Sequence, residues 1–189
     1  MAEGKNQSKQ VYFMVLTALF TALTVLGAFI RIPTATVPFT LQILFVLLAG
    51  VLLGPFWGAL SQLLYILLGL IGLPVFAGGG GLAYVMQPSF GFLTGYILGA
   101  AAAGWIAGSG KPSPWRTGAA CLAGLAVIYA IGLPYMAFIL NVHLSRQLDA
   151  KYIITNGCLI FLPWDAVKVA GAVILARVLK PVISRQIKA

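Results

Sequence analysis

Residues 11–30 read Val-Tyr-Phe-Met-Val-Leu-Thr-Ala-Leu-Phe-Thr-Ala-Leu-Thr-Val-Leu-Gly-Ala-Phe-Ile and carry no charge. An apolar run of about 20 residues is the length that an α-helix needs to cross the hydrocarbon core of a bilayer. The polar leader before it contains Lys5 and Lys9, and the run is longer than the apolar core of a signal peptide. We therefore interpret this stretch as a retained membrane-spanning helix.

The composition extends this interpretation to the whole chain. Of the 189 residues, 61% are hydrophobic and only 8% are charged, whereas a soluble domain carries roughly 25% charged residues. This number of charges is too small to cover the outside of a soluble core. Lipid must therefore act as part of the solvent. The apolar runs are long rather than alternating, which favours helices over a transmembrane β-barrel.

Six segments are apolar and long enough to be predicted as spanning helices, and we expect them to form a single membrane domain over residues 1–189. They cover about 11–30, 39–53, 57–71, 88–107, 117–140 and 153–179. The second and third are short and meet at Gly54-Pro55, a pattern that often flanks a site within the membrane. The predicted fold class is an all-α membrane protein with six transmembrane helices.

The net charge of +9 comes from basic residues scattered at the ends of the apolar runs, which argues against a nucleic-acid partner. With six crossings, the termini and the loops after the second and fourth helices share one side of the membrane. The opposite side holds only Arg31, Arg146 and Lys151. The positive-inside rule therefore places both termini in the cytoplasm. The basic residues on the terminal side are Lys5, Lys9, Lys111, Arg116, Arg177, Lys180, Arg185 and Lys188.

Asp165 is the only acidic residue within an apolar stretch, and Lys168 lies three residues later on the same helix face. A charge within the bilayer costs at least ~2.5–3.5 kcal/mol, so such residues face the bundle interior and usually mark function. Pro163 frees nearby backbone carbonyls, which can also serve a ligand. The pair suits a compact head group with both N–H and C=O, such as an amide or a urea. It can equally be a structural ion pair in which each residue neutralises the other.

Polar residues on the predicted outer side are further candidates. Thr40 is explained by helix capping, whereas Gln42, an amide within an apolar run, needs hydrogen-bond partners. The glycine run 78–81 lacks the lysine of a phosphate-binding loop, so it is either a reverse turn or a close backbone approach to a ligand. Tyr84 and Gln87 follow it and are candidates for polar contacts with a ligand.

The residues contain no nucleophile–base pair and no metal-ligand cluster, because the chain has one histidine and three acidic residues. We therefore expect a protein that is not an enzyme and that needs no metal or cofactor. Ala18 and Ala22 place small residues along the first helix, a spacing that permits close helix packing within this bundle or against another membrane protein. A self-sufficient secondary transporter driven by an ion gradient is an alternative that the residues leave open.

Four stretches together resemble the BioY family, over nearly the whole chain. They are Val37-Pro-Phe-Thr-Leu-Gln42, Leu47-Leu-Ala-Gly-Val-Leu-Leu-Gly54, Gly72-Leu-Pro-Val-Phe-Ala-Gly-Gly79 and Asp165-Ala-Val-Lys168. The resemblance implies a six-helix S-component fold and a biotin-binding subunit of an energy-coupling factor (ECF) transporter in the bacterial cytoplasmic membrane. It also implies a transmembrane T component and two cytoplasmic ATPase subunits as partners. One stretch departs from the family, which usually has Gly-Pro-Thr-Gly-Gly-Tyr where this chain has Gln87-Pro-Ser-Phe-Gly-Phe.

The family's D-x-x-K pair contributes to its binding site, and the matching residues here are Asp165 and Lys168. By this resemblance we expect Asp165 to accept a ureido N–H of biotin and Lys168 to donate to the ureido oxygen or the valerate carboxylate. Trp164, Tyr84 and Phe39 are the candidates for covering the apolar thiophane ring.

The resemblance also implies roles for the loops and for the first helix. The gate falls on the region of Thr40 and Gln42, and part of the pocket falls on the segment from Gly78 to Gln87, which includes Gly79. The face that docks on the T component falls on Ala18 and Ala22.

Overall fold

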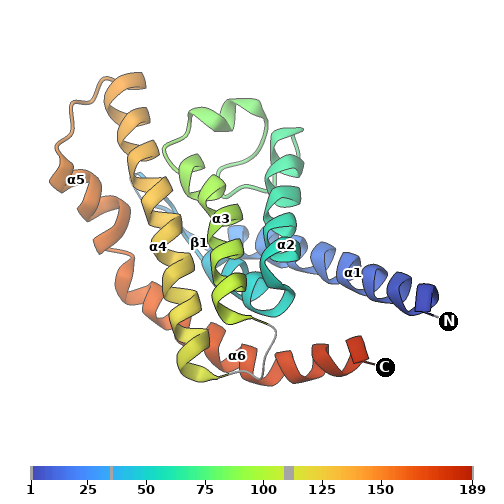
Figure 1. Ribbon diagram of the computed structural model, residues 1–189. Coiled ribbons are helices and arrows are strands. Elements are labelled where there is room, and N and C mark those ends of the chain that lie inside the picture. Colours follow the sequence, from blue (N-terminus) through green and yellow to red (C-terminus); the bar gives the residue numbers. More distant parts are fainter. Residues whose placement is uncertain (1, 35, 109–112, 189) are drawn as a thin grey trace.

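The computed structural model describes residues 2–34, 36–108 and 113–188, and most of them are helical (Figure 1). Lys111, one of the basic residues used for the predicted topology, lies outside the described residues. Among the residues described, five helical segments are long and apolar enough to cross a membrane. In chain order the elements are α1 (Ala2–Phe29), β1 (Arg31–Ile32), β2 (Phe39–Thr40), α2 (Gln42–Leu70), η1 (Leu82–Met86), α3 (Phe90–Ala107), α4 (Pro114–Phe138), η2 (Ile139–His143), α5 (Ala150–Ile154), η3 (Thr155–Leu159) and α6 (Leu162–Lys188).

The predicted second and third helices are the two parts of α2, which is interrupted at Gly54. The backbone of Gly54 has φ 84° and ψ 179°, a conformation that favours glycine, and Pro55 follows it. The two parts then pack against each other, since a Cβ on Gly58 would lie 2.8 Å from the Cα of Gly50. The break that Gly54-Pro55 predicts is therefore confirmed.

Several predicted boundaries are wrong. The first helix begins at Ala2 rather than near residue 11, because the polar leader continues the same helix. Phe39 and Thr40 do not begin a helix. They pair with β1 in the antiparallel register Arg31↔Thr40 and Ile32↔Phe39, and α2 starts at Gln42.

The last predicted helix, 153–179, is not one continuous helix. Its chain forms α5 and the π-helical η3, turns at residues 160 and 161, and then forms α6, which continues to Lys188. Pro163 explains the break, because proline has no N–H to continue an earlier helix and is tolerated in a first turn. The new helix therefore begins beside Asp165, which stands in its first turn.

The helix α3 lies between α2 and α4 and packs on both, while α1 packs on α2 (Figure 1). The fit of α2 on α3 is close, since a Cβ on Gly50 would come within 2.2 Å of the carbonyl oxygen of Ala100. Both chain ends lie on the right of the view in Figure 1. The large buried side chains come mainly from α2, α3 and α4, which form the core that supports the site.

A polar seam joins α1 to the second part of α2. The Thr21 hydroxyl donates to the carbonyl oxygen of Ser61 at 2.9 Å, and the amide nitrogen of Gln62 lies 3.3 Å from the hydroxyl of Thr24. All four residues are buried. Gln62 therefore lies at a seam between two helices.

Candidate substrate-binding site

Asp165 and Lys168 form a buried ion pair at the start of α6. The Lys168 Nζ lies 2.8 Å from Oδ1 of Asp165, and the Asp165 side chain is fully buried. The hydroxyl of Tyr129, from α4, donates to the other carboxylate oxygen, Oδ2. The N-terminal end of a helix also favours a negative charge. The predicted pair is therefore present, and both oxygens of its carboxylate have a partner.

The ammonium of Lys168, which bonds to Asp165, also lies beside the β-hairpin. Its ammonium lies 4.9 Å from the ring centroid of Phe39, which is within the range of a cation–π contact. An ammonium has three N–H donors, and only one protein acceptor, Asp165, is within bonding distance among the residues described. Lys168 therefore retains donor capacity on the side that faces the pocket.

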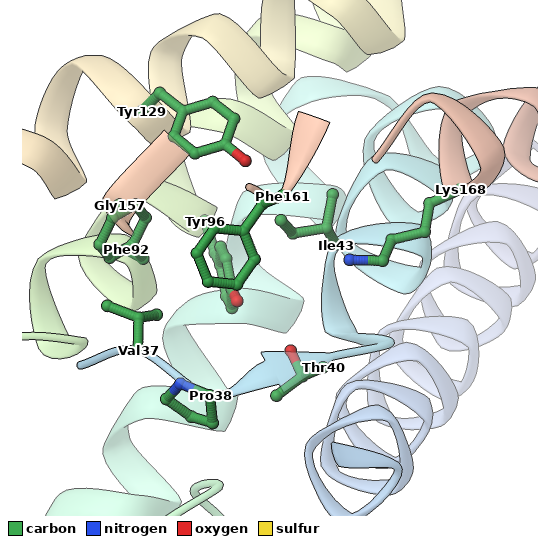
Figure 2. A pocket seen from close by; sticks show the side chains of 10 residues that line it. All are labelled: Val37, Pro38, Thr40, Ile43, Phe92, Tyr96, Tyr129, Gly157, Phe161 and Lys168. Carbon is green, nitrogen blue, oxygen red and sulfur yellow. The ribbon is translucent and has the colours of Figure 1, made fainter. Parts of the chain in front are cut away.

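A pocket lies in front of this ammonium and holds about 350 Å³ of space between protein atoms, including its open mouth. Figure 2 shows Thr40 and Lys168 on one side of it, Tyr96 and Phe161 near the centre, and Tyr129 on the opposite side. Apolar side chains make up most of the lining, and Lys168 is its one charged member. The lining residues are Val37, Pro38, Thr40, Ile43, Phe92, Tyr96, Tyr129, Gly157, Phe161 and Lys168.

An aromatic cluster stands beside the ammonium where β2 meets the break before α6. The rings of Phe39 and Phe161 are stacked with their centroids 4.9 Å apart, and Trp164 meets Phe39 edge-on at 5.9 Å. Phe161 is buried and lines the pocket, whereas Trp164 is 58% exposed. The structure therefore places Phe39 and Trp164 together, with Trp164 on the outer side of the cluster.

Gln42 is fixed by hydrogen bonds on both sides. Its Oε1 accepts from the Thr40 hydroxyl at 3.1 Å, and its Nε2 donates to the Tyr65 hydroxyl at 2.7 Å. Tyr65 in turn donates to the carbonyl oxygen of Val75 at 3.3 Å. Gln42 is only 2% exposed, and a buried amide needs hydrogen-bond partners. The hydroxyls of Thr40 and Tyr65 are those partners. It links the hairpin residue Thr40, which lines the pocket, to the second part of α2.

The glycine segment and Tyr84 lie next to this network. Tyr84 is buried against Phe76, with ring centroids 4.5 Å apart, and Phe76 meets Tyr65 edge-on at 5.4 Å. Gly79 forms a reverse turn, because its N–H donates to the Phe76 carbonyl and its carbonyl accepts from the Phe76 N–H. The prediction of a reverse turn in the glycine run is confirmed. The Gly79 N–H already donates to a protein carbonyl, so it is not free to bind a ligand. Gln87 is exposed at the end of η1.

Several residues that line the pocket do not stand out in the sequence, notably Tyr96, Tyr129 and Phe161. Charged and amide side chains are the clearest exceptions within an apolar run. A tyrosine in the middle of a spanning helix carries the same signal in a weaker form, because its buried hydroxyl needs a partner. For Tyr129 that partner is the carboxylate of Asp165.

Several known proteins resemble this chain in sequence or in fold. The model of the BioY family matches residues 4–185. The chain belongs to the BioY family. It is 47% identical over 145 residues to the "Probable biotin transporter BioY" of Lysinibacillus sphaericus, covering 76% of this chain and 74% of that one. It is 40% identical over 168 residues to the "Biotin transporter BioY" of Thermotoga maritima, covering 88% and 95%.

A solved structure agrees with the fold. The S-component for biotin from an ECF-type ABC transporter superposes with a TM-score of 0.78 at 28% identity, over 93% of both chains. The chain therefore belongs to a family of transport proteins rather than of enzymes. Ala18 and Ala22 are both exposed on its helix α1.

Proposed function

We propose that this chain is the biotin-binding S component of an ECF-type transporter. The observation that carries the proposal is the Lys168 ammonium, which is paired with Asp165 and is the one charged group among the described residues that line a mostly apolar pocket. Tyr129 in turn donates to the other oxygen of Asp165. Family membership and the shared fold support it independently. An uncharged ring system with one polar edge matches such a lining, because apolar walls bury the ring and a few polar groups fix its orientation.

Biotin presents a ureido group with two N–H donors and one oxygen acceptor, fused to an apolar thiophane ring with a valerate chain. Asp165 is fully buried and does not line the pocket, but each oxygen of its carboxylate keeps lone-pair capacity beyond its contact with Lys168 or Tyr129. In this proposal a ureido N–H bonds to that carboxylate after bound biotin displaces the side chains that cover it. Lys168 donates to the ureido oxygen or to the valerate carboxylate. Phe39 and Phe161 cover the thiophane ring, with Trp164 closing the outer side of the same cluster.

Thr40 and Gln42 act in this proposal as part of the gate at the edge of the site. Thr40 lines the pocket from β2, and its bond to Gln42 couples the hairpin to α2. Tyr84, Gly79 and Gln87 support the site from the segment after α2, with Tyr84 packed into the aromatic cluster of Phe76 and Tyr65.

The chain crosses the bacterial cytoplasmic membrane six times in this proposal, with both parts of α2 crossing and both termini in the cytoplasm. The distribution of basic residues supports this orientation. The β-hairpin and the pocket beside it then lie toward the outer surface, where they meet external biotin.

Energy for uptake comes from partners, namely a transmembrane T component and two cytoplasmic ATPase subunits. Ala18 and Ala22 lie exposed on α1 and offer a surface without bulky side chains for close helix packing. Ala22→Trp should prevent assembly with the T component and leave biotin binding unchanged. Ala126→Trp, at an exposed alanine of α4, is the matched control and should preserve both.

The experiment that tests the function is to purify the chain alone and to reconstitute it. We expect the purified protein to retain or bind biotin, and proteoliposomes with this chain alone to show no sustained uptake. Uptake should begin when the T component, the ATPases and ATP are added. Ion-driven uptake by the chain alone would support the secondary transporter instead, and absence of any biotin binding would contradict the proposal.

A further inference from the structure

Two cations converge on the C-terminal end of α3, far from the biotin pocket. The Arg116 Nε donates to the carbonyl oxygen of Ile106 at 2.7 Å, and the Lys180 Nζ lies 2.7 Å from that of Gly108. Arg116 comes from the first turn of α4 and Lys180 from α6, so three elements meet here, at the bottom of the view in Figure 1. Lys180 is only 8% exposed.

The glycine that ends α3 makes room for this arrangement. Gly108 has φ 56°, and a Cβ at this position would lie 2.4 Å from Nη2 of Arg116. The guanidinium therefore lies directly over the last turn of α3. Among the described residues, only its Nε has a protein acceptor, and a guanidinium has further N–H donors that can bind an anion.

The charge at this point is not balanced by the protein. A helix C-terminus carries about −0.5 of a unit charge, so two cations on it leave an excess of about +1.5. In the part of the chain whose side chains are described, neither cation has a carboxylate partner. Asp165, on the same helix as Lys180, lies about 22 Å away along the axis at ~1.5 Å per residue, and Asp149 caps α5.

Two tryptophans mark the level of this cluster in the membrane. Trp105, in the last turn of α3, is 78% exposed, and Trp115, in the first turn of α4, is 89% exposed. Exposed tryptophans at helix ends gather at the level of the lipid head groups. An arginine matches the geometry of a phosphate through paired N–H donors, and the cytoplasmic leaflet supplies anionic lipids.

From these observations we infer that Arg116 and Lys180, flanked by Trp105 and Trp115, form a binding site for the phosphate of an anionic phospholipid at the cytoplasmic surface. The inference rests on the proposed orientation of the chain but not on its ligand. The bound lipid neutralises the cluster and holds the α3–α4–α6 end of the bundle at the membrane surface.

The test has two measurements on the full chain. Native mass spectrometry measures the retention of phosphatidylglycerol, and thermal unfolding in detergent micelles compares added phosphatidylglycerol with added phosphatidylcholine. We expect the wild type to retain phosphatidylglycerol and to be stabilised by it. Arg116→Gln should weaken this binding about fivefold, the equivalent of about 1 kcal/mol for one surface charge. Arg116→Lys should restore most of it, and Arg31→Gln, at the exposed β-hairpin, should change nothing.

Two results would overturn the site. One is a wild-type protein whose unfolding temperature rises no more with phosphatidylglycerol than with phosphatidylcholine. The other is equal retention by the wild type and Arg116→Gln. Inorganic phosphate at matched ionic strength distinguishes a free anion, and stabilisation by phosphate as strong as by the lipid would overturn the lipid assignment. Biotin affinity, measured in the same samples, should be unchanged in each variant, so a failure here is separable from a failure of the proposed function.

Discussion

The hydroxyl of Tyr129 donates to Oδ2 of Asp165, the carboxylate oxygen that Lys168 does not contact. The contact joins α4 to the start of α6 and gives the buried carboxylate a neutral donor as well as its ionic partner. A charge in the membrane interior persists when it is paired and hydrogen-bonded. Tyr129 therefore fixes the orientation of the Asp165 carboxylate. That carboxylate in turn holds the Lys168 ammonium at the pocket.

Removing this hydroxyl should weaken biotin binding without unfolding the protein. A hydrogen bond to a charged group contributes about 1.5–3 kcal/mol, so Tyr129→Phe should weaken affinity about tenfold or more in a calorimetric titration. The matched control is Tyr135→Phe on the same helix, where the lost hydroxyl donates to the Val85 carbonyl outside the pocket lining. A similar loss of affinity in both variants would contradict the role of Tyr129.

The ion pair itself can be tested by removing one charge or both. Asp165→Asn leaves a buried ammonium and Lys168→Met leaves a buried carboxylate, so each should lower the unfolding temperature. The double variant leaves neither charge and should recover much of that stability, but it should still bind biotin poorly. Thermal unfolding and biotin titration on the same samples separate the two roles. Normal biotin affinity in the double variant would show a purely structural pair.

Two buried glutamines of α2 should behave differently. Gln42→Leu removes the link between Thr40 and Tyr65 and should lower biotin affinity, because the hairpin loses its anchor at the pocket. Gln62→Leu removes the bond to Thr24 at the α1–α2 seam and should lower the unfolding temperature with affinity unchanged. Equilibrium dialysis with labelled biotin gives the comparison, and equal affinities for the two variants would argue against the Gln42 link.

The close packing of α2 on α3 predicts that alanine substitutions at two glycines change the stability of the protein in very different ways. Gly50→Ala should strongly destabilise the protein, because the new Cβ would lie 2.2 Å from the carbonyl oxygen of Ala100. Gly118→Ala on α4 should be neutral or stabilising, since its nearest neighbour, Val173, is 4.0 Å away and alanine favours a helix. The measurement is the unfolding temperature in detergent. A tolerated Gly50→Ala would mean that the two helices are not packed this closely.

Much of the helical architecture follows from the sequence, because long apolar runs in lipid must satisfy their own backbone hydrogen bonds. The interruption at Gly54 and the pairing of Asp165 with Lys168 are both predictable from local chemistry and spacing. The β-hairpin is not, since Phe39 and Thr40 pair with residues on the other side of a proline-containing loop. The break before α6 is signalled by Pro163, but its place depends on how α5 and η3 end.

The pocket is less predictable than the helices. Its lining combines five separate parts of the chain, from Val37 in the hairpin to Lys168 in α6, and their contact depends on tertiary packing. Phe161 and Tyr96 have the same apolar neighbours in sequence as many core residues, so no local pattern distinguishes them. Gln87, which stands out as polar in the sequence, is exposed and lies outside the lining.

The central claim is that biotin binds at the Lys168 ammonium in this pocket, and one titration tests it most directly. Purified wild type, Lys168→Met and Lys151→Met should be compared by isothermal titration with biotin, with Lys151 as an exposed lysine of α5. We predict one bound biotin per chain for the wild type and for Lys151→Met, and affinity at least about tenfold weaker for Lys168→Met. Equal biotin affinity for all three proteins would contradict the account.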